Sequence, residues 1–355
     1  MTKTNLTQIA YYARRALKIG TIFLIAFLIV RGAVKTGLKI WRAANPPLPP
    51  KPTMAFGKLP KIKFPDSTIK TSELSFKLET IEGALPEFPE SIKVYFIPQK
   101  AANLLASSRA KDKAYKMGFK NEPEIISETV YHWTSQSAPP TILKMNIVTG
   151  NFDLRYDFRN DPEILTSKNL PTTQQTAQEA KGFLVSGDFL PEDLANGTAE
   201  FEYLFFEPPE LKPVLSFSEA NFIRVNLFHG NLNDLKILPP NPKKSLISFL
   251  FSSSRTTGKR IVEIDYTYFP IEKEILATYP LKPASLAWEE LQNDGGYIAH
   301  LRQNEKGPII IRKVLLAYYD SQEPQYYLQP IYVFEGDREF FAYVPAIDSK
   351  WMEQD

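Results

Sequence analysis

The residues that most often carry acid–base or metal chemistry are few and scattered in this sequence. His132, His229 and His300 lie in three separate segments of the 355-residue chain. An imidazole acts as a metal ligand or general base only where other donors converge on it. The sequence has no H-E-x-x-H, G-x-S-x-G, Walker or G-x-G-x-x-G motif. We therefore expect packed or hydrogen-bonded histidines, and we predict no catalytic residue, no cofactor and no metal site.

Two groups of acidic or amide residues could also suggest a metal site. Asp153, Asp157 and Asp161 recur at every fourth position. On a strand, Asp153 and Asp157 share the outer face with Arg155, which favours a solvated surface of balanced charge. The loop at residues 230–234 offers oxygen ligands, but it lacks the spacing and the late glutamate of a calcium loop. It is interpreted as a turn whose side chains bond their own backbone.

The most aromatic surface is predicted near the C-terminus, where a strand at residues 326–334 is apolar on both faces. Such a strand is buried on both sides, which predicts an internal domain contact. The alternative is a surface for a protein partner, because interfaces are rich in tyrosine. The residues assigned to this candidate partner surface are Tyr326, Tyr327 and Tyr332.

The elements that must position these residues follow from hydrophobic periodicity. Apolar residues at helical spacing predict three helices, and alternation of apolar and polar residues predicts strands, including a hairpin that turns at residues 149–151. A helix lying on an antiparallel sheet buries one face of each element. The sequence therefore predicts an α+β fold of tandem helix-on-antiparallel-sheet modules. The helices are predicted at residues 101–117, 173–185 and 284–291, and strands at 92–96, 143–147, 152–158, 199–206, 221–228, 245–251, 262–268, 309–319, 326–334 and 339–344.

An uncharged apolar run at residues 19–30 indicates a transmembrane helix. Alone it is shorter than the roughly 20 residues that cross a bilayer core. Aromatic residues on both sides, Tyr11 and Tyr12 before it and Trp41 after it, suit the two membrane interfaces. Cations beyond the run recur on one helical face, where they can contact anionic lipid. The predicted membrane-interface residues are Lys18, Arg31, Lys35, Lys39, Trp41 and Arg42.

A cleaved secretory signal is the alternative interpretation, since Arg14, Arg15 and Lys18 precede a short apolar core. No A-x-A cleavage site follows Val30, which favours an uncleaved signal anchor. Cations on the two sides nearly balance, so the positive-inside rule barely decides the orientation. The short basic tail favours an N-terminus inside the cell and the large domain outside the cytoplasm.

Composition limits the possible partners. The chain has 42 Lys and Arg against 40 Asp and Glu, and much of the excess lies near the apolar run. No globular part is basic enough to predict nucleic-acid binding. Cysteine is absent, which excludes disulfides, thiol nucleophiles and zinc–thiolate sites. The predicted partners are the lipid bilayer and, beyond it, another membrane or envelope protein.

Proline density and element order predict the domain organisation. The proline-rich residues 45–65 cannot continue a helix and favour an extended, semi-rigid spacer that lifts the domain off the bilayer. We expect a short basic tail at 1–18, a transmembrane and juxtamembrane helix at 19–42, a linker at 43–66, and α+β modules at 67–165, 166–275 and 276–355.

The layout resembles a known family. A single N-terminal anchor followed by helix-plus-sheet modules is similar to the YycH/YycI group of membrane-anchored regulators, and to PepSY-type domains more broadly. The match is carried by Tyr279-Pro280-Leu281 before the helix at 284–291, by Tyr318-Tyr319, and by the segment 327–334. The linker also resembles that of uncharacterised anchored proteins of candidate-phyla bacteria. The resemblance implies extracytoplasmic modules that are not enzymes.

These observations predict a single-pass membrane protein whose outer modules bind or regulate a partner without catalysis. An envelope hydrolase with an unrecognised acidic site is the first alternative, and converging carboxylates of raised pKa in a deep pocket would favour it. A domain tethered on the cytoplasmic side is the second.

Overall fold

The computed structural model describes residues 3–44, 51–67, 69–167, 169–256, 258–302, 304 and 307–353, with only the backbone described at 3–8, 40 and 42–44. The chain divides into two compact units, Met1–Lys51 and Pro52–Asp355. The first contains the helix α1, and the second contains the described sheets. Helices combined with mainly antiparallel sheets confirm the predicted α+β class.

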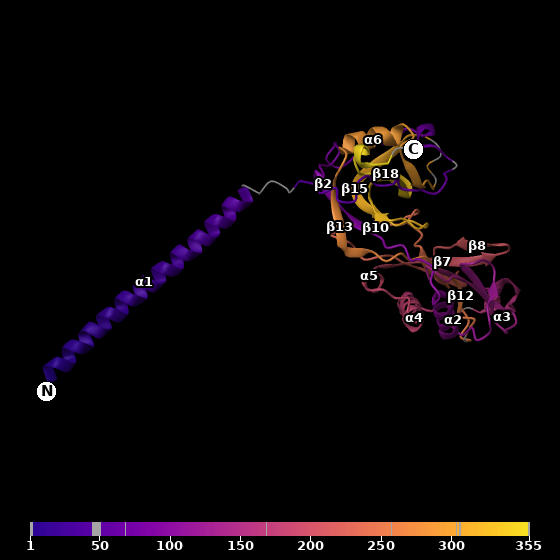
Figure 1. The fold of residues 1–355 in the computed structure, drawn as a ribbon, viewed down its shortest axis with the longest axis horizontal. Coiled ribbons are helices and arrows are strands. Elements are labelled where there is room, and N and C mark those ends of the chain that lie inside the picture. Colours follow the sequence, from indigo (N-terminus) through magenta and orange to yellow (C-terminus); the bar gives the residue numbers. More distant parts are fainter. Residues whose placement is uncertain are drawn as a thin grey trace. The chain divides into compact units, whose positions relative to one another are not determined.

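α1 (Lys3–Ala44) is one continuous helix of 42 residues (Figure 1). Its segment Ile9–Lys39 is long and apolar enough to cross a membrane, a property that anchors share with N-terminal signal sequences. The helix is longer than predicted, because the tail expected at 1–18 is helical from Lys3 onward. Prolines at positions 46 and 47 follow its end, and proline cannot extend a helix.

The folded unit has two parts. A nine-stranded antiparallel sheet is the basis of the first part, which comprises residues 98–229 and 246–270 and which we call the insert lobe. The β5–β6 hairpin is the one predicted from the sequence, with Gly150 at positive φ in its turn. In order, the sheet contains β3 (Glu124–Ile125), β4 (Val130–Thr134), β5 (Thr141–Asn146), β6 (Phe152–Tyr156), β12 (Ile261–Tyr266), β11 (Ile247–Ser252), β9 (Phe222–Leu227), β7 (Ala199–Glu207) and β8 (Glu210–Pro213).

Strand register gathers the apolar side chains of this sheet on one face. One cross-strand row contains Trp133, Leu143, Leu154, Ile264, Phe249 and Val225. α2 (Ala106–Lys116) and α4 (Thr173–Ser186) cover this face, and they bury small residues against it, such as Ala114 and Ala180. α2 starts at Ala106, five residues later than the predicted helix. α5 (Glu192–Ala195) adds Leu194 to the same core.

The opposite face of the sheet is charged over its middle. Arg155 pairs with Asp265, and Arg224 lies 3.6 Å from both Glu202 and Glu263. At one end of this face a second core forms under η2 (Phe158–Asn160) and α3 (Pro162–Thr166). The charged face agrees with the solvated surface predicted around Arg155 and Asp153.

The remaining chain forms the base lobe (residues 52–97, 230–245 and 271–353), in which α6 (Ala284–Gln292) covers one face of a sheet (Figure 1). η1 (Thr71–Glu73) contacts α6. This sheet contains β1 (Phe76–Leu78), β15 (Ile309–Tyr319), β17 (Pro330–Gly336), β18 (Phe340–Pro345) and β14 (Tyr297–His300), with β10 (Ile237–Leu238) also paired to β15. A second sheet contains β13 (Glu272–Pro280), β2 (Ser91–Phe96) and β16 (Tyr327–Leu328), and the short helices η3 (Asp337–Glu339) and η4 (Ser349–Trp351) complete the lobe.

The prediction of a spacer at 43–66 is wrong for residues 52–65, which pack onto the base lobe. Leu59 is fully buried and Ile62 is 8% exposed. The backbone N–H of Leu59 donates to Trp351 O at 2.8 Å, and Tyr279 Oη donates to Gly57 O at 2.8 Å. Apolar side chains of this segment cover the face of the base-lobe sheet opposite α6. Residues 52–65 are therefore held in place on the base lobe, and we call this segment the strap. Of the rest of the predicted spacer, residues 43–44 belong to α1, and residues 45–50 lie outside the described residues.

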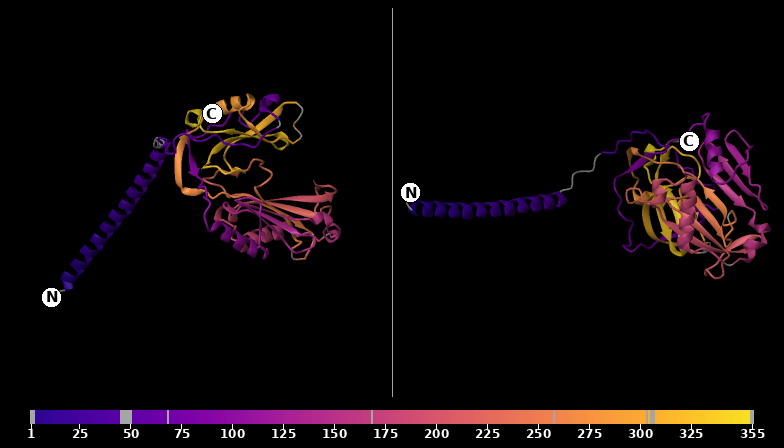
Figure 2. Two further views of the ribbon diagram at one scale, coloured as in Figure 1. Left: turned by 45° about the vertical axis from the view of Figure 1, so that its right-hand side comes forward. Right: turned by 90° about the horizontal axis from the view of Figure 1, so that it is seen from below.

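The sheets do not follow the three predicted modules. β6 from the first module pairs with β12 from the second, so the predicted boundary at 165/166 lies within one sheet. β1 and β2 pair with β15 and β13 from much later in the chain. The insert lobe, coloured from purple-magenta through pink to light orange in Figure 2, is therefore an excursion from the base lobe. The segment 230–245 returns to the base lobe and adds β10 beside β15.

Candidate ligand-binding site

A cavity of about 1100 Å³ lies in the insert lobe at one end of the helix-covered sheet face. Its walls come from the C-terminal end of α2, the N-terminal half of α4, and the loops that precede β5 and β12. The floor is apolar and includes Phe119, Leu154 and Phe183. A volume of this size holds a molecule of drug size or larger.

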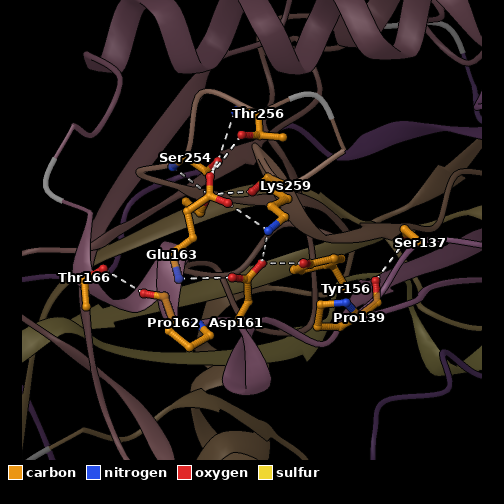
Figure 3. A network of polar contacts seen from close by, with 11 residues as sticks. Ser137, Pro139, Tyr156, Asp161, Pro162, Glu163, Thr166, Ser254, Thr256 and Lys259 are labelled. Carbon is orange, nitrogen blue, oxygen red and sulfur yellow. Dashed lines mark hydrogen bonds and ion pairs between the residues drawn. The ribbon is translucent and has the colours of Figure 1, made fainter.

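A network of polar groups borders this cavity and is centred on Lys259 (Figure 3). Lys259 Nζ lies 2.7 Å from Asp161 Oδ2 and 2.9 Å from Glu163 Oε2. Tyr156 Oη donates to Asp161 Oδ2 at 2.5 Å. The hydroxyls of Ser254 and Thr256 donate to Glu163 Oε1 at 2.9 and 3.0 Å.

Local sequence explains how the two carboxylates reach Lys259. Asp161 is the N-cap of α3, and its Oδ1 accepts a hydrogen bond from the backbone N–H of Glu163 at 3.1 Å. Pro162 occupies the first helical position, where its fixed φ is favourable. Asp161, which lies beyond the strand face predicted for Asp153 and Asp157, is only 4% exposed. The signal that sequence reasoning missed was the cap residue followed by proline.

The network fixes the charge of every member. Burial raises the pKa of Asp161, but hydrogen bonds from Lys259 and Tyr156 outweigh it and lower that pKa below its ordinary value. Hydrogen bonding from Lys259 lowers the pKa of Glu163 as well. Hydrogen bonds to Asp161 and Glu163 raise the pKa of Lys259, and burial raises the pKa of Tyr156 to about 12. At neutral pH the two carboxylates are therefore ionised, the lysine is charged and the phenol is neutral.

A second ion pair continues the rim of the cavity. Arg260 contacts both oxygens of Glu179 on α4, with Nε and one terminal nitrogen each at 3.1 Å. The capping box of α4, formed by Thr172 and Gln175, fixes the start of that helix. Arg255 is exposed at the same rim. The arrangement offers an apolar floor with fixed hydrogen-bonding and charged groups around it, which suits recognition of a ligand with apolar and polar parts.

The predicted tyrosine surface is not assembled as expected. Tyr332 is wrongly assigned to it, because its side chain is 1% exposed and its Oη donates to Lys282 O at 2.7 Å within the base lobe. Tyr327 is half-buried and stacks on Phe56 with ring centroids 4.8 Å apart. Tyr326 is 58% exposed. The predicted strand 326–334 breaks at Gln329, and its two parts join different sheets.

The predicted membrane-interface residues all lie on α1, which carries the cations at helical spacing as expected. The side chains of Lys18, Arg31, Lys35 and Lys39 are exposed. Trp41 is 62% exposed. The side chain of Arg42 lies outside the described residues.

The histidines occupy three different environments. His229 is buried, with Nδ1 2.8 Å from Asp193 Oδ2 and Nε2 3.2 Å from Asp320 Oδ2. Burial lowers the pKa of His229, but the charge of Asp320 and the hydrogen bonds to both carboxylates outweigh it and raise that pKa to about 10. A protonated ring donates from both nitrogens, so it joins Asp193 of the insert lobe to Asp320 of the base lobe. His132 lies 3.5 Å from Glu124, and His300 ends β14.

Comparison with known proteins gives no functional assignment. No family model and no curated protein sequence matches this chain. Among solved structures, an uncharacterized protein from Eubacterium rectale ATCC 33656 is similar over 72% of this chain and 82% of its own, with 11% identity and a TM-score of 0.33. A likeness at that TM-score carries no argument about fold or function.

Proposed function

We propose that this chain is a single-pass, membrane-anchored binding protein whose folded unit lies outside the cytoplasm and acts without catalysis. The observation that carries the binding role is the large insert-lobe cavity, with its apolar floor and its rim of fixed charges. The YycH/YycI resemblance adds the hypothesis that ligand capture regulates another membrane or envelope protein.

Anchoring is supported by the surface of α1. Apolar side chains such as Phe23, Ile22 and Ile29 are each at least 65% exposed on this helix. A continuous apolar surface of this length is unfavourable in water and favourable in lipid. The basic residues before the apolar run support the proposed signal-anchor orientation.

The state of the carboxylates supports binding over hydrolysis. A general acid needs a carboxyl group that is protonated near neutral pH. Asp161 and Glu163 have lowered pKa values because Lys259 contacts both of them. They serve better as fixed acceptors than as proton donors.

Filling the cavity should prevent ligand capture while the fold remains intact. Leu170→Trp introduces an indole at the wall of the cavity, and Leu286→Trp places the same group at an exposed position of α6 as a control. We expect the first variant to bind anilinonaphthalene sulfonate about tenfold more weakly than the parent, which corresponds to about 1.4 kcal/mol. The fluorescence of the purified full chain in one detergent measures this. Equal affinity in parent and both variants would contradict the proposed site.

A further inference from the structure

A second cavity of about 360 Å³ in the insert lobe is bordered by cations. Lys100 and Lys113 line it from the segment before α2 and from α2 itself. Arg109 lies one turn before Lys113 on the same helix face. The cavity is separate in its lining from the larger one, since none of its lining residues is shared.

These three cations contact only neutral acceptors among the described residues. Lys100 Nζ donates to Thr149 O at 2.9 Å, and Lys113 Nζ donates to Asp188 O at 3.0 Å. Arg109 donates to the side-chain oxygen of Asn103 at 2.9 Å. The nearby carboxylate, Asp188, lies 3.4 Å from Lys116 instead. The group therefore contains three cations, none of which forms an ion pair with a carboxylate of the described residues.

This arrangement lowers the pKa of both lysines. Burial and the charge of Lys100 lower the pKa of Lys113, and they outweigh the charge of Asp188, which raises it. Burial and the charge of Arg109 also lower the pKa of Lys100. An anion placed among these groups would relieve the repulsion, and phosphate oxygens are suited to lysine and arginine donors.

Apolar side chains project into water beside the cations. Leu104 is fully exposed and Leu105 is 66% exposed, immediately before α2. The Asn103 side chain that accepts from Arg109 also accepts from the backbone N–H of Leu105, so the leucines lie next to the cations. A soluble anion would use only the cations, whereas a lipid surface offers an anionic head and an apolar interior to the two parts together.

We propose that residues 100–113, which end in α2, form a membrane-docking surface, at which Lys100, Arg109 and Lys113 bind the phosphate of an anionic lipid headgroup and Leu104 and Leu105 insert beside it. The inference rests on the proposed function in one respect. Anchoring by α1 raises the effective concentration of lipid at the folded unit.

The absence of cysteine makes a direct test possible. A single cysteine at Leu104→Cys, labelled with an environment-sensitive fluorophore, reports lipid contact in the full chain. Leu215→Cys, in the same lobe and equally exposed, is the matched control. The labelled chains are compared on vesicles of phosphatidylcholine alone and with phosphatidylglycerol added. We expect a blue shift at position 104 only, and only with phosphatidylglycerol.

Charge variants identify the headgroup site. Lys100→Gln, Arg109→Gln and Lys113→Gln together should lower the docking equilibrium constant by about 100-fold, because each basic residue near an anionic surface contributes about a fivefold gain. Lys100→Arg and Lys113→Arg should keep the shift.

Three outcomes of the fluorescence experiment would each overturn the proposal: equal shifts at positions 104 and 215, no dependence on phosphatidylglycerol, or a shift retained in the glutamine variant. Protection of Lys113 from acetylation by inorganic phosphate, but not by phosphatidylglycerol vesicles, would also overturn it in favour of a soluble ligand.

Vesicle flotation separates this inference from the anchor. Flotation with phosphatidylcholine alone measures insertion of α1 into the bilayer. The phosphatidylglycerol-dependent fluorescence shift measures lipid contact at the docking surface. A chain that floats only with phosphatidylglycerol and shifts at position 104 would support the docking surface and contradict the anchor. A chain that floats with neither vesicle would contradict both.

Discussion

At the scale of single residues, partners in space decide what each polar side chain does, and sequence reasoning finds only some of them. The absence of catalytic motifs could be observed directly, and the charge balance around Arg155 was predictable from strand alternation. The pairing of Asp161 with Lys259 was not, because the two residues are 98 positions apart and meet through strand pairing and a loop. The same holds for His229, whose partners come from α5 and from the residue after β15.

The ion pairs of His229 predict a defined pH dependence of stability. Its pKa is about 10 in the folded protein, above the ordinary 6.5, so the folded state holds this proton more tightly. The stabilisation is complete below about pH 6.5 and is lost as the pH rises toward 10. His229→Gln should cost about 3 kcal/mol at neutral pH, because two half-buried carboxylates lose the cation that lies between them. Urea unfolding at a series of pH values measures both effects, and an identical slope in parent and variant would exclude this role for His229.

Because Tyr332 is buried, we expect its substitution to destabilise the fold, whereas a partner surface would predict loss of binding with the fold intact. Tyr332→Ala should lower the free energy of unfolding by about 3–5 kcal/mol, since it leaves a large cavity beside α6. Tyr326→Ala removes an exposed ring and should change it by less than about 0.5 kcal/mol. Chemical denaturation distinguishes them. If Tyr332→Ala were as stable as the parent and lost a protein partner, the surface hypothesis would hold instead.

At the scale of elements, hydrophobic periodicity predicts the regular helices and strands, and it misses extended segments whose apolar residues have no period. α4 and α6 and the β5–β6 hairpin were predictable because caps, turn residues and apolar spacing agree. The strap at 52–65 was not, because its prolines suggest an extended spacer and its isolated apolar residues have no period. Leu59 and Ile62 are nevertheless buried, since an extended segment can also cover a sheet face.

The strap yields a matched pair of neighbouring variants. Leu59→Ala should lower the free energy of unfolding of the folded unit by about 3 kcal/mol through loss of buried apolar contacts. Lys58→Ala, at an exposed position, should leave it within about 0.5 kcal/mol. Differential scanning calorimetry or urea unfolding reports the difference. Two variants of equal stability would mean that residues 52–65 act as a spacer after all.

At the scale of the whole molecule, domain organisation depends on pairings that no local pattern encodes. The predicted modules followed the order of elements along the chain, whereas β15 pairs with β1 and β10 and so joins segments far apart in sequence. α1 is the opposite case. Its apolar composition alone made a long apolar helix predictable, and its proposed role as an anchor is the claim on which the location, the lipid contact and the regulatory hypothesis depend.

Alkaline carbonate extraction of membranes that contain the full-length chain tests that claim most directly. We expect the parent to remain in the membrane pellet at its full mass, and Leu24→Lys combined with Leu28→Lys, which places two charges in the span, to be released. Release of the parent into the supernatant, or a mature chain that begins after Val30, would contradict the account.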